Sequence, residues 1–109
     1  MDFSHMAVLM DKQYILEYLK ANKESIRSRY GVTQIGLYGS FARNEQKDSS
    51  DIDIAIEMES RKKNIHNFFG LKREFESVFG RRVDLGIESS LKPAVVRNVK
   101  NEIEYVWPK

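Results

Sequence analysis

A strand of alternating isoleucine and polar residues, running from Asp51 to Met58, constrains the fold of this chain more than any other segment. Successive side chains of a β-strand point to opposite faces, so the isoleucines share one face while Asp51 and Asp53 share the other. An apolar face of this kind must be buried, whereas two neighbouring carboxylates need water or cations. The segment therefore predicts a β-sheet with helices packed on one face and paired acids on the other.

The remaining apolar patterns predict helices and strands that alternate along the chain. Expected helices cover residues 11–29, 41–45, 64–79 and 93–101, and expected strands cover residues 32–38, 51–58, 82–87 and 105–107. The short link between the first two strands favours antiparallel pairing, and the helical crossover before the third favours a parallel strand. The expected fold class is therefore α/β (α+β), a small mixed β-sheet packed with helices.

The composition fits one small domain that spans residues 1–109. The net charge is +2, from 18 basic and 16 acidic side chains, and the chain contains no cysteine. This balance gives no support to direct nucleic-acid binding, and no apolar run is long enough to cross a membrane. The start of the chain lacks the pattern of a signal peptide, so a cytoplasmic protein is expected. Residues 1–10 are expected to form a flexible N-terminal segment, and a cloning remnant would explain Ser4-His5-Met6.

Three aspartates are candidate metal ligands. Asp51 and Asp53 repel each other on one strand face, and a divalent cation would remove that repulsion. Their hard oxygen atoms favour Mg²⁺ or Mn²⁺. Asp84 lies between two apolar residues of a later strand, and three carboxylates suffice to bridge two divalent ions. The alternative interpretation is a solvated or ion-paired strand face with Asp84 as an isolated exposed acid.

Gly39 and Ser40 stand where the first strand meets the expected short helix. A glycine there lets backbone N–H groups approach a phosphate, and the serine hydroxyl can donate to a phosphate oxygen. Arg43 follows one helical turn later and is placed to contact phosphate. The alternatives are an ordinary turn with Ser40 as the helix N-cap, and an ion pair between Arg43 and a carboxylate.

These residues together resemble a known signature. Gly39-Ser40-Phe41-Ala42-Arg43, a polar loop and then Ser50-Asp51-Ile52-Asp53-Ile54 are similar to the motif of the DNA polymerase β-type nucleotidyltransferase superfamily. The fuller pattern is closest to the minimal nucleotidyltransferase branch, which includes the MntA-like antitoxins paired with HEPN toxins. Asp84, between Val83 and Leu85, matches the third acidic motif of that branch.

The resemblance implies a nucleotidyltransferase fold and a role for each motif residue. Gly39, Ser40 and Arg43 would bind the nucleotide, Asp51 and Asp53 would bind both metal ions, and Asp84 would complete the metal site that activates the attacking hydroxyl. All three aspartates would thereby be catalytic.

The resemblance also implies an enzyme that transfers a nucleoside monophosphate to a hydroxyl of a HEPN-family partner. The donor would be ATP, which gives AMP, or another NTP. Such a chain would be the antitoxin of a toxin–antitoxin pair that works by AMPylation. Two alternatives remain: a catalytically silent module that occludes a toxin, and transfer to a small molecule. Core packing is expected, ahead of partner contact, for five aromatic residues: Phe68, Phe69, Phe75, Tyr105 and Trp107.

Overall fold

The computed structural model describes residues 10–108, and a mixed four-stranded sheet is its centre. The strands are β1 (Val32–Tyr38), β2 (Ile52–Met58), β3 (Val83–Ile87) and β4 (Glu104–Trp107), in the spatial order β3-β2-β1-β4. β1 pairs antiparallel with β2 and with β4, whereas β2 pairs parallel with β3. The expectation of a small mixed sheet is confirmed. The prediction for the N-terminal segment 1–10 falls, apart from Met10, outside the described residues.

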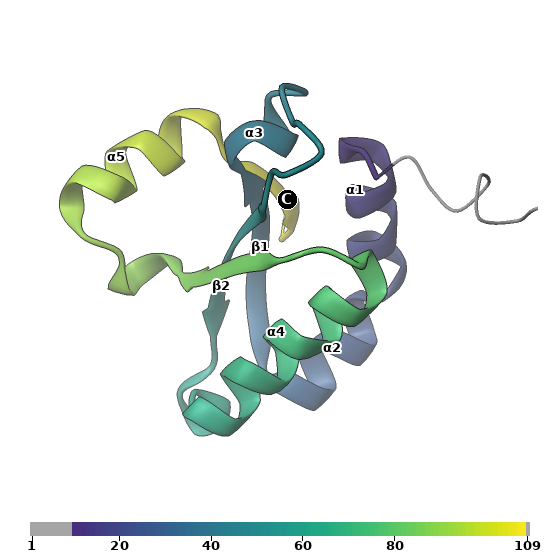
Figure 1. Cartoon of the computed structure of the whole chain (residues 1–109). Helices are drawn as coiled ribbons and strands as arrows, with labels where there is room; N and C mark the ends of the chain where they lie inside the picture. The colour runs from purple at the N-terminus through teal and green to yellow at the C-terminus, as the bar shows by residue number, and fades with distance from the viewer. Residues whose placement is uncertain (1–9, 109) are drawn as a thin grey trace, which may run out of the picture.

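The long helices divide unequally between the two sides of the sheet (Figure 1). On one side lie three of them, α1 (Lys12–Ala21), α2 (Lys23–Tyr30) and α4 (Ile65–Phe79). On the other side stands α5 (Pro93–Glu102), and the short α3 (Gly39–Ala42) continues directly from the end of β1. Two turns of 3₁₀-helix, Ser60–Lys62 and Glu88–Ser90, complete the order. None of the helices within residues 10–108 has the length and hydropathy needed to cross a membrane.

The prediction of a single helix over residues 11–29 is wrong, because the helix is interrupted at Asn22. Asp11 begins α1 as predicted, since its side chain accepts a hydrogen bond from the Tyr14 N–H at 2.9 Å. At Asn22 both the backbone N–H, at 3.1 Å, and the side-chain amide, at 2.8 Å, donate to the carbonyl of Tyr18. Asparagine can satisfy a carbonyl in this local way, which ends one helix and allows α2 to start in a new direction. Gly31 then ends α2 with the predicted left-handed conformation, φ 73°.

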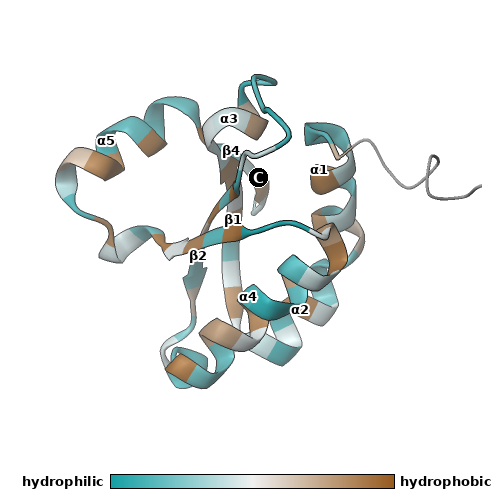
Figure 2. Ribbon diagram, viewed as in Figure 1, coloured by the Kyte–Doolittle hydropathy of each residue, from teal (hydrophilic) through white to brown (hydrophobic). Residues whose placement is uncertain are grey.

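The core lies between β1, β2 and the three helices on their side. Ile52, Ile54 and Ile56 are completely buried, as the alternation predicts. Figure 2 shows apolar segments on the strands and polar ones along the loop that joins α3 to β2. Phe75 and Trp107 belong to the core, as expected. Phe68 is partly buried against it, whereas Phe69 and Tyr105 are exposed.

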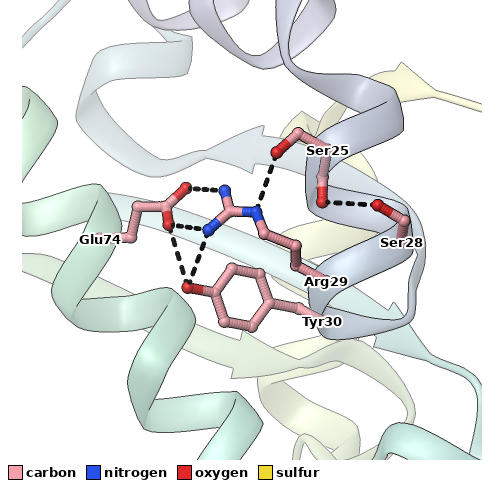
Figure 3. A network of polar contacts seen from close by, with 5 residues as sticks. All are labelled: Ser25, Ser28, Arg29, Tyr30 and Glu74. Carbon is pink, nitrogen blue, oxygen red and sulfur yellow. Dashed lines mark hydrogen bonds and ion pairs between the residues drawn. The ribbon is translucent and has the colours of Figure 1, made fainter.

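A polar network fixes α2 against α4 (Figure 3). The Arg29 guanidinium donates to both carboxylate oxygens of Glu74, at 2.7 Å each, and the Tyr30 hydroxyl donates to the same carboxylate at 3.0 Å. Arg29 also donates to the Ser25 hydroxyl at 2.9 Å. A bidentate pair with additional donors is a strong form of ion pair, so it holds the two helices in a defined orientation.

Candidate active site

The structure brings Asp53 and Asp84 side by side on the face of the sheet opposite the helical core. They are directly paired in the parallel register of β2 and β3, and Tyr38 pairs with Asp53 from the antiparallel neighbour β1. Asp51 lies one residue before β2 begins, so the strand starts at Ile52 rather than at Asp51 as predicted. Asp84 is exposed, as the alternative interpretation expects, but the register places it next to Asp53 rather than alone.

The site carries unbalanced negative charge. Burial, followed by the nearby Asp84, Asp51 and Glu102, raises the pKa of Asp53 to about 6 from an ordinary 3.8, and only Arg43 acts in the opposite direction. Burial, followed by the nearby Asp53, Asp84 and Glu102, also raises the pKa of Tyr38 to about 12. A titratable group perturbed by burial and by like charge is typical of a functional site.

Gly39 makes the close approach between the two motifs possible. Its φ of 77° is in the left-handed region, and a Cβ atom added there would lie 2.9 Å from Cγ of Asp53 and closer still to its Oδ2. The short helix α3 begins at Gly39, two residues earlier than expected. Tyr38 therefore occupies the N-cap position and Ser40 lies within the first turn, so Ser40 is not the N-cap.

Arg43 contacts carboxylates in this structure. Its Nε atom is 2.9 Å from Glu45 and its Nη1 atom is 2.7 Å from Glu102, and 44% of its side chain is exposed. Glu102 also accepts a hydrogen bond from the Gly39 N–H at 3.1 Å. Sequence reasoning missed Glu102, because nothing in the local pattern of α5 relates its last residue to Gly39, 63 positions away.

Arg81 organises the loop that leads to Asp51, and sequence reasoning missed it as well. Its Nη1 atom donates to three backbone carbonyls of the loop, those of Lys47 at 3.3 Å, Asp48 at 2.8 Å and Ser50 at 3.0 Å. Its guanidinium also lies 5.2 Å from the centre of the Phe41 ring. One side chain thus connects α3, the polar loop and the beginning of β3.

The donor set fits a divalent cation. Carboxylate oxygens are the hard ligands that Mg²⁺ and Mn²⁺ prefer, and the raised pKa of Asp53 reflects a repulsion that a cation would relieve. In the part of the chain that the structure describes, no three acidic, histidine or cysteine side chains converge closely enough to enclose a metal ion. The assignment of Asp51, Asp53 and Asp84 as ligands is therefore a prediction for the loaded protein.

An apolar cavity of about 410 Å³ opens at the start of α4, and none of the three aspartates lines it. It is lined mainly by Ile65, Phe68, Phe69 and Ile87, with Lys63, Asn64 and Ser90 at its edge. The lining offers no carboxylate, so this cavity does not have the chemistry of a Mg²⁺ site.

Comparison with known proteins covers the strands, the Gly39 turn and the three aspartates together. The sequence profile of the family described as "Nucleotidyltransferase domain" matches residues 19–106, which include the Gly39 turn and all three aspartates. The chain belongs to this nucleotidyltransferase family. The resemblance found in the sequence motifs is thereby confirmed.

Relatives within the family include small proteins of nearly the same length. The protein adenylyltransferase MntA of Thermococcus cleftensis is 37% identical over 98 residues, which cover 90% of this chain and 98% of the relative. A crystal structure of a toxin–antitoxin with AMP-PNP aligns with a TM-score of 0.68 and 21% identity, over 83% of this chain and 73% of the other. A tri-AMPylated Shewanella oneidensis HEPN toxin in complex with an MNT antitoxin aligns with a TM-score of 0.62 and 19% identity, over 86% and 73%. The two structures support the expected nucleotidyltransferase fold.

Proposed function

We propose that this nucleotidyltransferase transfers AMP from ATP to a hydroxyl group of a partner protein in a Mg²⁺-dependent reaction. The proposed partner is a HEPN-family toxin, which makes this chain the antitoxin of the pair. The observation that carries the proposal is the register pairing of Asp53 with Asp84 directly beside the Gly39 turn. This pairing supports a cation site next to backbone donors that suit a phosphate group.

Each predicted residue has a task in the proposed reaction. Asp51, Asp53 and Asp84 hold two divalent cations, which when bound lower the pKa of the acceptor hydroxyl and neutralise charge on the pyrophosphate. Gly39 and Ser40 orient the triphosphate, and their neighbour Arg43 adds a positive charge.

The bond changes follow from nucleotidyl transfer at the α-phosphorus. The acceptor oxygen forms a bond to that phosphorus while the bond to the bridging oxygen of the pyrophosphate breaks. Asp84 is the proposed group that assists removal of the hydroxyl proton, and no residue of this chain needs to form a covalent intermediate.

The nature of the partner rests on the relatives. The MntA relative is named a protein adenylyltransferase, and the toxin in one aligned structure is an AMPylated HEPN protein bound to its MNT antitoxin. We therefore propose a tyrosine hydroxyl of a HEPN-family protein as the acceptor. We also propose that the pair acts in the cytoplasm.

The test is transfer of label from ATP labelled at the α-phosphate to a purified HEPN-family protein, the proposed partner. With Mg²⁺, the wild type is expected to label the partner, whereas Asp53→Ala leaves it unlabelled. ATP labelled at the γ-phosphate must give no label, because AMP transfer releases that phosphate. Asp48→Ala, an exposed acid in the polar loop, is the matched control and keeps the activity.

Other outcomes would select the alternatives. Tight binding of the partner without label from any NTP would show a silent module that acts by occlusion. Transfer of label to a small molecule while the partner stays unlabelled would show a different acceptor class.

A further inference from the structure

The carboxylate of Glu102 sits on the groups proposed to bind the triphosphate. One of its oxygen atoms accepts from the Gly39 N–H at 3.1 Å, and the other lies 2.7 Å from Nη1 of Arg43. Both donors belong to the nucleotide-binding motif, and both bind an anionic oxygen of this chain. A carboxylate with two acceptor oxygens resembles part of a phosphate group in charge and geometry.

The side chain of Glu102 lies at the end of α5, where it can rotate while the helix stays in place. In α5 only Val99 is buried, and Figure 1 shows that helix standing apart from α1, α2 and α4. Immediately after Glu102 the chain is anchored, because the side chain of Ile103 packs against Gly36 of β1 closely enough to exclude a Cβ atom there. Release of the carboxylate therefore requires rotation of one partly exposed side chain, not displacement of β4.

The carboxylate of Glu102 has attractive groups on one side and a repelling carboxylate on the other. Gly39 and Arg43 attract its carboxylate, whereas Asp53 lies near enough for Glu102 to contribute to its raised pKa. An incoming triphosphate needs the same N–H group and the same guanidinium, and it repels a carboxylate at that position. The single N–H of Gly39 cannot donate to both anions at the same time, and the Nη1 group of Arg43 that now faces Glu102 is also occupied.

We propose that Glu102 is an internal competitor of the nucleotide, which holds the Gly39 N–H and Arg43 until a triphosphate displaces it. The inference rests on the nucleotide site of the proposed function but not on the acceptor or the partner. If Glu102 instead positions Arg43 for the nucleotide, removal of its carboxylate weakens nucleotide binding, whereas competition predicts tighter binding.

The experiment measures the affinity of the partner-free protein for AMP-PNP with Mg²⁺ by isothermal titration calorimetry. Glu102→Ala is expected to bind AMP-PNP about tenfold more tightly than the wild type, because the competing carboxylate and its two hydrogen bonds are removed. Glu102→Gln is expected to change in the same direction by a smaller factor, because its amide oxygen can still accept from the Gly39 N–H. Unchanged or weaker binding by Glu102→Ala, or no binding by any variant, would overturn the proposal.

Glu104→Gln is the matched control, because it removes a neighbouring carboxylate that pairs with Lys12. Its affinity for AMP-PNP is expected to equal that of the wild type. A cycle with Arg43→Ala gives a second readout: if Glu102 competes through Arg43, the gain from Glu102→Ala shrinks in the Arg43→Ala background. A full tenfold gain in that background would contradict the competition through Arg43.

Hydrogen exchange of the same proteins separates competition from a merely structural contact. AMP-PNP is expected to speed exchange of the backbone amides at the end of α5, because Glu102 then loses its contact with the Gly39 N–H. Slower exchange there on nucleotide binding would indicate a positioning role. If the affinity gain is found but no partner is ever labelled, this inference stands and the proposed function fails. If the partner is labelled but the affinity gain is absent, only this inference fails.

Discussion

Two polar clusters on opposite faces of the sheet, one around Glu74 and one around Asp53, place a carboxylate in opposite electrostatic surroundings. Between α2 and α4, Glu74 is surrounded by donors, and its hydrogen bond with Arg29 is the main cause of its lowered pKa. On the other face, Asp53 is surrounded by acids, and burial and those acids raise its pKa. The first cluster is complete within the chain and holds helices together. The second carries unbalanced negative charge, which the proposed cations would offset.

The largest expected effect separates the clusters by activity. Asp53→Asn is expected to lower AMP transfer to the partner by about 10³-fold, which corresponds to about 4 kcal/mol of lost transition-state stabilisation. Glu74→Gln is expected to leave the transfer rate within a factor of about two, because its network only joins helices. The measurement is the initial rate of labelling at saturating ATP. A comparable loss in both variants would mean that the Glu74 network is part of the active site.

A pair of glycine substitutions tests how closely the second cluster is packed. Gly39 and Gly80 both have left-handed φ angles, 77° and 61°, but only Gly39 faces another group, Asp53, where a Cβ would be added. Gly80→Ala is expected to lower the free energy of unfolding by about 1 kcal/mol, the cost of the left-handed conformation alone. Gly39→Ala is expected to lower it by about 2 kcal/mol more, because of overpacking. Urea denaturation measures both, and equal losses would argue against the close contact with Asp53.

The two carboxylates should affect stability with opposite dependence on pH in metal-free buffer. The raised pKa of Asp53 means that ionisation disfavours the folded state, so this contribution is favourable below about pH 4 and is lost as pH rises through about 6. Asp53→Asn is therefore expected to add about 1–2 kcal/mol to the free energy of unfolding at pH 7.5, after allowance for solvent screening, and nothing at pH 4.

Glu74→Gln should show the reverse pattern. Because the pKa of Glu74 is lowered in the folded protein, its contribution is present above its unfolded pKa and is lost as pH falls through its folded pKa. The substitution is expected to cost about 1 kcal/mol at pH 7, a loss that disappears in acid. Denaturation curves across pH 3.5–7.5 measure both variants, and parallel curves would show that the charge environments are alike.

The smallest effect is expected from an exposed ion pair that belongs to neither cluster. Arg61 and Glu59 are 3.3 Å apart, with 83% and 39% of their side chains exposed. Arg61→Ala is expected to change the free energy of unfolding by less than about 0.5 kcal/mol and to leave AMP transfer unchanged. A larger loss of stability would mean that solvent screening at this surface is weaker than is usual for an exposed ion pair.

Local periodicity was enough to predict which face of β2 and of its neighbour carries the candidate site. The alternation around Asp53 and the crossover before Asp84 predict two acids on one face, and the register confirms their pairing. Contacts between distant segments were not predictable in this way. The position of Glu102 depends on the rotation and placement of a whole helix, and the break at Asn22 depends on a single side-chain hydrogen bond.

The contacts of Arg81 have a consequence for the length of the polar loop. Three loop carbonyls, those of Lys47, Asp48 and Ser50, converge on one nitrogen atom of Arg81, which follows Asp51 and Asp53 in the sequence. An inserted or deleted residue would move at least one carbonyl out of reach, so the spacing between Gly39 and Asp51 is set by a residue outside that interval. Chains with a different spacing at this point are expected to need a different residue in place of Arg81.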